Sequence, residues 1–370
     1  MKILYVGHYK ENSGWSNAAI NNILALDSIG VDVVCKDIKL TNKPFNIPNR
    51  ILELEQKSLN GVTHCIQHIL PHHMVGSDQF KKSVCYYVGE SIHTKKNSWH
   101  SYLELVDEVW VPNIDLHKNT QQFVSNAVRI LPHTFDINKY RQEFKKINFG
   151  SESSFFKFYT IGDINDRKNM IETIKCFYHA FSSDQDVLFI AKIKKHGLTQ
   201  SNLQKYTEQL CESIQNSMKL YSDKTKYGNV RFITSDCDDD FIYALHNSCD
   251  CFLNISHGEA WSIPSFESMC FGNTPICSNE GGPAMYINDD KAHGTLIDGT
   301  YTICNQSDAA FDHIFTGSEF WFQPNHISTV NAMKFYYEHR DVKNKEECLT
   351  YASKFDYSII GQQIKDMLND

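Results

Sequence analysis

The chain has 370 residues, of which 41% are hydrophobic and 22% are charged, as is ordinary for a soluble globular protein. That length exceeds what one compact core usually holds, so we expect two domains. The net charge of −8 argues against a nucleic-acid or anionic-membrane partner, because such partners favour a basic face, although a local basic groove can exist within an acidic chain. The opening MKILYVGHYK contains one lysine and a five-residue apolar strand, which is too short for a signal peptide. No later run approaches the roughly 18 apolar residues of a membrane span. We therefore expect a cytoplasmic protein.

The 12 cysteines and 17 histidines raise the question of disulfides or a metal site. The cysteines are scattered, form no C-x-x-C pair and often stand inside apolar runs, so we interpret them as reduced, buried side chains. The stretch HCIQHILPHH (64–73) has no fixed ligand spacing and is interrupted by Pro71, which argues against a metal there. The run DCDDD (236–240) resembles a metal-binding D-x-D, but it fits an acidic helix start better.

The first 140 residues alternate predicted strands and helices. A buried strand at 2–7 is followed by a polar loop (9–16) that contains Gly14, a helix at 17–29 that stops at Gly30, and a strand at 31–35. This is a Rossmann-like opening, although the loop is not GxGxxG and predicts no dinucleotide fingerprint. Further strands and helices complete one doubly wound α/β domain: strands at 62–66, 83–88, 108–112 and 128–131, helices at 99–105 and 113–124.

The second half repeats this alternation of strands and helices after a polar linker at 140–154. It begins with a strand at 155–161 that ends in Gly162, and it continues with helices at 170–181, 203–220 and 239–247 and strands at 187–191 and 230–233. Helices are predicted further on at 329–340, 346–353 and 358–368. We predict an N-terminal Rossmann-like domain (1–148), a C-terminal one (155–350) and a C-terminal helix (351–370) that packs back toward the N-terminal domain.

Residues 249–287 form the most informative stretch. An apolar strand at 251–255 leads to the polar turn SHGE (256–259), a helix that begins at Pro264 and ends near Gly272, a strand at 274–277, and a Gly281-Gly282-Pro283 turn. Ligands of such βαβ units lie at the carboxyl ends of the strands. Glu259 and Glu267 are therefore expected to face that crevice.

A pair of cations, Arg167 and Lys168, stands in a polar loop just before a predicted helix. A helix N-terminus and two cations suit a diphosphate, although a solvated surface pair would have the same sequence. Carboxylates accept hydrogen bonds from sugar hydroxyls, so Glu267 on a ribose and Glu259 on a sugar complete a consistent set. Each glutamate alone could equally cap a helix start.

The segment HGEAWSIPSFESMCFGNTPICSNEGGPAMYI (257–287) resembles the E-x7-E region of retaining, family-4-type glycosyltransferases of the GT-B fold. The likeness extends to GDINDRKN (162–169), DEVWVPN (107–113), LPHTFDINKY (131–140) and the SGW loop (13–15), and so covers nearly the whole chain. It implies two Rossmann-like doubly wound domains facing across a cleft. It also implies sugar transfer from a nucleotide-diphosphate sugar to an acceptor hydroxyl, with retained configuration and no active-site metal or other cofactor.

Carried over by position, the resemblance assigns roles to individual residues. Lys168 and Arg167 would hold the diphosphate, Glu267 the ribose and Glu259 the donor sugar, while no side-chain nucleophile is implied. Backbone amides around Gly14 and at Gly281-Gly282 would complete the phosphate site. The implied donor-binding set is Gly14, Gly258, Glu259, Ala260, Trp261, Ser262, Ile263, Glu267, Gly281 and Gly282. For the active-site histidine of the N-terminal domain, His93 is the first choice, with His68 and His133 behind it, and each could instead be structural.

Three positions depart from the family pattern. Asp163 follows Gly162 where the family often has arginine, and Ala260 and Ser262 stand where glycines are usual. The same architecture also hosts sugar-nucleotide epimerases and phosphorylases, and these departures leave open a non-catalytic nucleotide-sugar or glycan-binding protein. The donor base and sugar, the oligomeric state and the acceptor (a glycan, small molecule, lipid, protein or modified nucleic acid) stay open.

Overall fold

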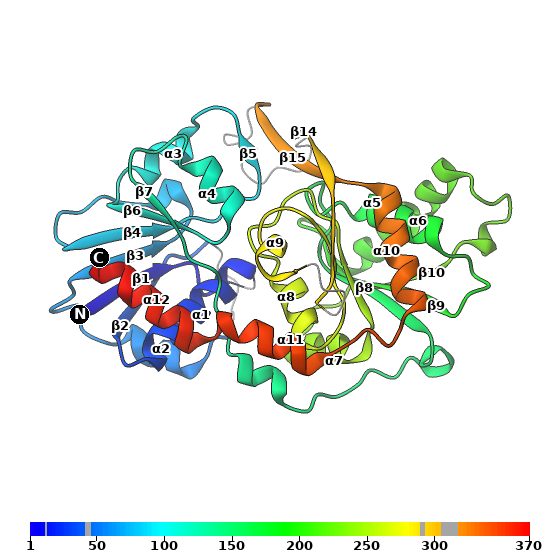
Figure 1. The fold of residues 1–370 in the computed structure, drawn as a ribbon, viewed down its shortest axis with the longest axis horizontal. Helices are drawn as coiled ribbons and strands as arrows, with labels where there is room; N and C mark the ends of the chain where they lie inside the picture. The colour runs from blue at the N-terminus through cyan, green and yellow to red at the C-terminus, as the bar shows by residue number, and fades with distance from the viewer. Residues whose placement is uncertain (12, 41–45, 289–292, 305–316) are drawn as a thin grey trace. The chain divides into compact units, whose positions relative to one another are not determined.

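The computed structural model describes residues 1–11, 13–40, 46–288, 293–304 and 317–370. The chain divides into two compact units. Unit 1 contains residues 1–140, a stretch that ends at Glu319, and residues 351–370, and unit 2 contains residues 141–310 and 320–350. Each unit is built on a six-stranded parallel sheet with helices packed against it (Figure 1). The predicted class, α/β with two Rossmann-like domains, is therefore confirmed.

Unit 1 follows the predicted order closely. Its sheet has the strand order β2-β1-β3-β4-β6-β7, and every neighbouring pair is parallel. Helix α2 and the short strand β5 escaped prediction, since each is brief and weakly periodic. The elements are β1 (Lys2–Gly7), α1 (Gly14–Ser28), β2 (Asp32–Asp37), α2 (Asn49–Glu55), β3 (His64–His68), β4 (Lys82–Tyr86), β5 (Ile92–His93), α3 (Ser98–Leu103), β6 (Glu108–Val111), α4 (Ile114–Thr120), β7 (Ala127–Ile130) and α12 (Tyr357–Asn369).

Helix α12 packs on α1 within unit 1. A Cβ on Gly361 would lie 2.6 Å from the backbone oxygen of Ala25, so glycine lets the two helices approach closely. The Tyr357 hydroxyl donates a hydrogen bond of 2.6 Å to Asn21. Ile364 and Leu368 are buried on this face, as the amphipathic pattern predicts, whereas Ile359 is 54% exposed.

A buried row of tyrosine and histidine side chains crosses the unit 1 sheet. Tyr5 and His68 share a hydrogen bond of 2.8 Å, and Tyr86 and His133 share one of 2.6 Å. The His68 ring packs edge-on against the Tyr86 ring, with 4.6 Å between the two ring centroids. Burial lowers the pKa of His133 to about 3 and the pKa of His68 well below its usual value. Both histidines are therefore neutral core residues at neutral pH.

These neutral histidines predict acid sensitivity. The unfolded chain takes up the His133 proton near pH 6.5 and the folded chain only near pH 3. The unfolded state thus binds more protons between these values, so stability falls as pH drops below 6.5. The loss at this one site should be about 2 kcal/mol between pH 6.5 and pH 5. Urea midpoints of the wild type and His133→Gln measured across this range should show a shallower slope for the variant. The exposed His339→Gln is the control, and equal slopes for all three proteins would contradict the assignment.

The rest of the chain forms a sheet of order β10-β9-β8-β11-β12-β13 with an antiparallel β14–β15 pair. Asp238 caps α7 by accepting a hydrogen bond of 2.9 Å from the Phe241 amide, which confirms DCDDD as an acidic helix start. Strands β13 to β15 and helix α9 escaped prediction. The elements are β8 (Phe156–Asp163), α5 (Met170–Ala180), β9 (Val187–Lys194), α6 (Gln200–Met218), β10 (Asn229–Ile233), α7 (Asp239–Ser248), β11 (Cys251–Asn254), α8 (Ile263–Cys270), β12 (Ile276–Ser278), α9 (Pro283–Tyr286), β13 (Thr295–Ile297), β14 (Gly299–Ile303), β15 (Glu319–Pro324), α10 (His326–Glu338) and α11 (Lys345–Ala352).

Two further expectations concern buried, reduced cysteines and membrane-spanning helices. All twelve cysteines are free thiols, and ten are buried, as predicted, whereas Cys211 and Cys237 are partly exposed. In the described part of the chain, no helix combines the length and apolar character needed to cross a bilayer.

Candidate functional site

The predicted cation pair meets Glu259 in unit 2. Arg167 and Lys168 lie in the loop between β8 and α5, and Glu259 lies in the loop between β11 and α8. Lys168 Nζ is 2.5 Å from Glu259 Oε1 although the two residues are 91 positions apart in the chain. Arg167 Nη1 donates to the Gly258 carbonyl at 2.8 Å and is 3.6 Å from Glu259 Oε2. Because β8 and β11 are parallel neighbours, their carboxyl ends bring these two loops together.

The Glu259 carboxylate is buried and charged. Burial by itself raises the pKa of this carboxyl, but Lys168 and Arg167 hold the pKa below its usual value, and Ser256 adds a hydrogen bond of 2.9 Å to Oε1. Its side chain is 8% exposed, against 20% for each cation. The cations thus reach further toward solvent than the carboxylate that holds them. A diphosphate could contact them from that side or exchange with Glu259 as their partner.

The Lys168 side chain crosses the end of β8. A Cβ on Gly162 would lie 3.7 Å from the Lys168 methylene carbons, so the lysine stem runs over this residue. The strand was predicted to end in Gly162, and in the structure its pairing with β9 continues one residue further, through Asp163. Asp163 is therefore the last residue of the strand. Asn169 then takes a left-handed conformation (φ 53°) as the N-cap of α5, and its side chain donates to the Ile255 carbonyl at 3.0 Å.

A buried polar network that the sequence analysis missed supports this loop. Asn254 Nδ2 donates to Ser262 Oγ at 2.6 Å and to Ser265 Oγ at 3.1 Å, and the two serine hydroxyls are 2.6 Å apart. Ser256 is in contact with the Asn254 side-chain oxygen as well as with Glu259. The one sequence signal was an asparagine at the end of an apolar strand, because a buried amide needs several partners.

Ser262 occupies a backbone conformation that favours glycine. Its φ of 64° and ψ of 72° lie in the left-handed region, and it is the N-cap of α8. Glycine suits this position because a Cβ in the left-handed region crowds the following carbonyl oxygen, which lowers the stability of the folded state by roughly 1 kcal/mol. Hydrogen bonds of the hydroxyl to Asn254 and Ser265 offset that cost.

Two substitutions at Ser262 should separate these effects. Ser262→Ala keeps the backbone strain and loses the hydrogen bonds, whereas Ser262→Gly loses the same bonds and relieves the strain. We expect the glycine variant to be about 1 kcal/mol more stable than the alanine variant in urea unfolding. An alanine variant as stable as the glycine variant would contradict the left-handed conformation.

The Gly281-Gly282 turn packs on the same loop. Gly281 has a φ of 66°, and a Cβ on Gly282 would lie 2.1 Å from the Trp261 Cα. The Gly282 amide donates to the Glu259 carbonyl at 2.9 Å, so this amide, which we expected to bind phosphate, is already used inside the protein. Glycine is required here for close backbone approach.

The other predicted donor residues lie in the loop before α8 and on α8 itself. Ala260 and Trp261 are buried, and the Trp261 ring packs 5.3 Å from Tyr286. Ile263 is the first residue of α8. Glu267 lies one turn further on, with its carboxylate 3.7 Å from His246 Nε2 and its side chain 13% exposed. His246 is fully buried and shares a hydrogen bond of 2.6 Å with the Tyr159 hydroxyl. The helix thus presents Glu267 next to α7.

The remaining predicted residues belong to unit 1. Gly14 is the first residue of α1 rather than part of a loop, because Ser13 caps the helix, and residue 12 of the predicted loop lies outside the described residues. His93 is 5% exposed in β5, with Nδ1 3.7 Å from Glu319 Oε1 and 3.3 Å from Asn97 Nδ2. Burial lowers its pKa, and Glu319 opposes that effect. His68 and His133 lie in the core.

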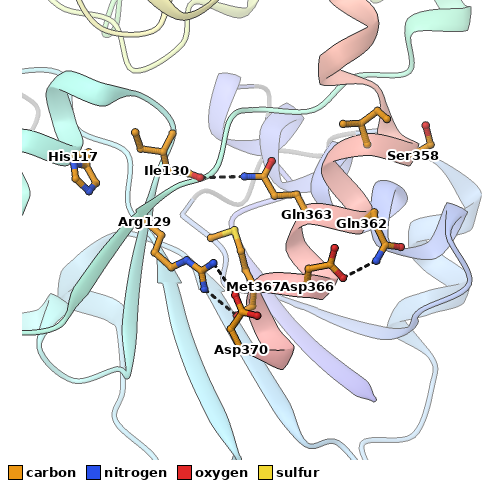
Figure 2. A pocket seen from close by; sticks show the side chains of 10 residues that line it. His117, Arg129, Ile130, Ser358, Gln362, Gln363, Asp366, Met367 and Asp370 are labelled. Carbon is orange, nitrogen blue, oxygen red and sulfur yellow. Dashed lines mark hydrogen bonds and ion pairs between the residues drawn. The ribbon is translucent and has the colours of Figure 1, made fainter.

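A separate pocket of about 770 Å³ lies in unit 1 between β7 and α12 (Figure 2). Arg129 pairs there with Asp370 at 2.9 Å, and Gln363 donates to the Ile130 carbonyl at 3.2 Å. None of the predicted site residues lines this pocket. The residues that line it are His117, Arg129, Ile130, Ser358, Ile359, Gln362, Gln363, Asp366, Met367 and Asp370. We therefore place the candidate site at the Glu259 loop.

Part of the chain matches a known protein family. Residues 211–310, which include Glu259 and Glu267, match the family model described as "Glycosyl transferases group 1". A search of the curated proteins returned no match.

Similar solved structures cover the whole chain. Anabaena HepE in complex with UDP and glucose is 15% identical, with a TM-score of 0.63 over 100% of this chain and 99% of that one. Sucrose-phosphate synthase from Thermosynechococcus elongatus is 13% identical, with a TM-score of 0.65 over 100% and 98%. Trehalose-6-phosphate synthase OtsA is 9% identical, with a TM-score of 0.65 over 100% and 99%. The family match and the shared fold together support a glycosyltransferase of the GT-B fold.

Proposed function

We propose that this protein is a retaining, family-4-type glycosyltransferase that transfers a sugar from a nucleotide-diphosphate sugar to an acceptor hydroxyl without an active-site metal. The observation that carries the proposal is the contact of Lys168 and Arg167 with the buried Glu259 at the carboxyl ends of two parallel strands. The similar HepE structures contain UDP with glucose and UDP-glucose, so we propose a UDP-sugar as donor.

In this proposal the two cations act on the leaving diphosphate. Negative charge grows on that group as the bond to the sugar breaks, and fixed positive charge stabilises it more in the transition state than in the ground state. The N-terminus of α5, immediately after Lys168, adds free amides and the positive end of a helix dipole. No metal is then needed to balance the diphosphate.

Glu259 has two parts in the same proposal. In the ligand-free protein it holds Lys168 and Arg167 in place, and with donor bound it accepts hydrogen bonds from sugar hydroxyls. Glu267 binds the ribose, since a carboxylate can accept hydrogen bonds from two vicinal hydroxyls. No side-chain nucleophile is assigned. The sequence predicts no particular acceptor, and the cytoplasmic location remains a prediction from the sequence.

A nucleotide screen followed by turnover assays tests the proposal. UDP should raise the melting temperature more than GDP or ADP, because a ligand stabilises the state that binds it. The preferred sugar nucleotide should then release UDP by hydrolysis or transfer, and Glu259→Gln should abolish that release. Added Mg²⁺ or Mn²⁺ should leave the rate unchanged, and NMR of the product should show the donor's anomeric configuration. Stabilisation by no nucleotide would contradict the proposal, whereas binding without turnover across many acceptors would favour a non-catalytic sugar-nucleotide-binding protein.

A further inference from the structure

Helix α10 packs against α5 in unit 2 (Figure 1). Three side chains with metal-ligand chemistry converge there. Glu172 and Cys176 lie one turn apart on α5, and His326 is the first residue of α10. Their ligand atoms all lie within 4.8 Å of one another. Glu172 Oε1 is 2.6 Å from His326 Nδ1, and Cys176 Sγ is 3.3 Å from the same nitrogen.

These separations are close to those of a tetrahedral metal site. Bonds of about 2.0 Å to nitrogen or oxygen and about 2.3 Å to sulfur place neighbouring ligand atoms roughly 3.3 to 3.6 Å apart. The sulfur–nitrogen separation of 3.3 Å is within about 0.3 Å of the value for such a pair, and the sulfur–oxygen separation is at most 4.8 Å. The oxygen–nitrogen separation has to open by roughly 0.7 Å, and Glu172 can do this because its side chain is 21% exposed.

His179 supplies an outer contact of the kind that orients metal-binding histidines. Its Nδ1 lies 2.8 Å from His326 Nε2, on the side of the ring away from Cys176 and Glu172. When Nδ1 of His326 binds a metal, the remaining ring proton is on Nε2 and donates to His179. Such a bond fixes the tautomer and the ring orientation.

Access and local charge complete the description. Cys176 is fully buried, whereas the His326 side chain is 30% exposed, so a fourth position occupied by water would face solvent. Two lysines repel a bound cation. The partly exposed Lys175 has its Nζ 3.8 Å from Glu172, and, beside the larger effect of burial, the charge of Lys334 also lowers the pKa of His179. The ordinary alternative is a Glu172–His326 ion pair beside a packed cysteine.

We propose that Glu172, Cys176 and His326 bind a zinc-type divalent transition-metal ion that fastens α10 to α5. A thiolate excludes Mg²⁺ and Ca²⁺, while the mixed sulfur, nitrogen and oxygen set suits Zn²⁺. Burial raises the pKa of the Cys176 thiol, so metal binding releases the thiol proton to solvent as the metal–sulfur bond forms. The inference does not depend on the proposed sugar transfer.

Metal titration of the full-length protein tests this site. After treatment with a chelator, the protein should take up one Zn²⁺ per chain and melt at a higher temperature. Co²⁺ in place of Zn²⁺ should give a thiolate-to-metal charge-transfer band, which binding to surface histidines alone cannot produce. Absence of stoichiometric uptake, or uptake of Co²⁺ without that band, would overturn the proposal.

Substitutions locate the ligands. Cys176→Ser and His326→Asn should each lose the Co²⁺ band and the Zn²⁺-dependent rise in melting temperature. Cys211→Ser on α6 and His339→Asn after α10 are matched controls and should keep both. A band that survives in Cys176→Ser would place the metal on another cysteine and reject the site. Circular dichroism of each variant without metal shows whether it is folded, so loss of binding can be separated from unfolding.

Discussion

Replacing Lys168 by alanine should reduce nucleotide release from the donor by about 10²- to 10³-fold, the effect typical of removing one group that stabilises developing negative charge. The same change should lower the free energy of unfolding by about 3 kcal/mol, because the buried Glu259 carboxylate loses its nearest cation and keeps the more distant Arg167 and the Ser256 hydroxyl as partners. Steady-state kinetics at saturating donor and urea unfolding measure the two effects separately.

An exposed lysine of the same unit provides the control. Lys226 Nζ lies 3.4 Å from Asp184 Oδ1, but the two side chains are 49% and 69% exposed. This ion pair therefore contributes little to the stability of the fold. Lys226→Ala should leave turnover unchanged and stability within about 0.5 kcal/mol of the wild type. A Lys168 variant with unchanged turnover would remove this residue from the diphosphate site. Unchanged stability would show that Arg167 and Ser256 suffice to hold Glu259 in its charged form.

Replacing Gly282 by alanine should have the largest effect on stability. The added Cβ would lie 2.1 Å from the Trp261 Cα and 2.5 Å from the Trp261 carbonyl carbon, so backbone has to move rather than a flexible side chain. That movement also breaks the hydrogen bond of the Gly282 amide to the Glu259 carbonyl. We expect a loss of about 3 kcal/mol or more, measured as a lower melting temperature and urea midpoint.

Gly162→Ala is the matched control for this prediction. Its Cβ would meet the Lys168 stem at 3.7 Å, an ordinary contact, and its backbone lies in a strand with no left-handed conformation. Stability should therefore change by less than about 0.5 kcal/mol. If Gly282→Ala changed stability as little as Gly162→Ala, that result would contradict the tight contact between the glycine turn and the Glu259 loop.

Local patterns were sufficient for the long elements. Helix α1 and strand β8 each have clear periodicity and clear ends, and the structure places both within a few residues of the prediction. Short elements such as β5, with two residues, and β13, with three, carry too few side chains for periodicity to show. Strand β13 is defined by its pairing with β12, which joins residues 19 positions apart, so only the assembled sheet shows it.

The candidate site divides in the same way. A cation pair before a helix and two glutamates eight residues apart were visible in the sequence, because each group rests on a short motif. The contact of Lys168 with Glu259 bridges 91 residues, and it exists because β8 and β11 are adjacent in the sheet. Asn254 and Ser265 were missed because a buried amide or hydroxyl looks like any other polar residue until its partners are known.

By itself the sequence determined the α/β class, the two Rossmann-like halves and the residue types of the candidate site, since these depend on local periodicity and motif spacing. Tertiary structure decided which charges pair, that Ser262 is held at positive φ, and that Gly282 has no room for a side chain. It also brought Glu172, Cys176 and His326 together across about 150 residues. Pairing, strain and clearance depend on distances between segments remote in the chain, which the packing of helices on a parallel sheet sets.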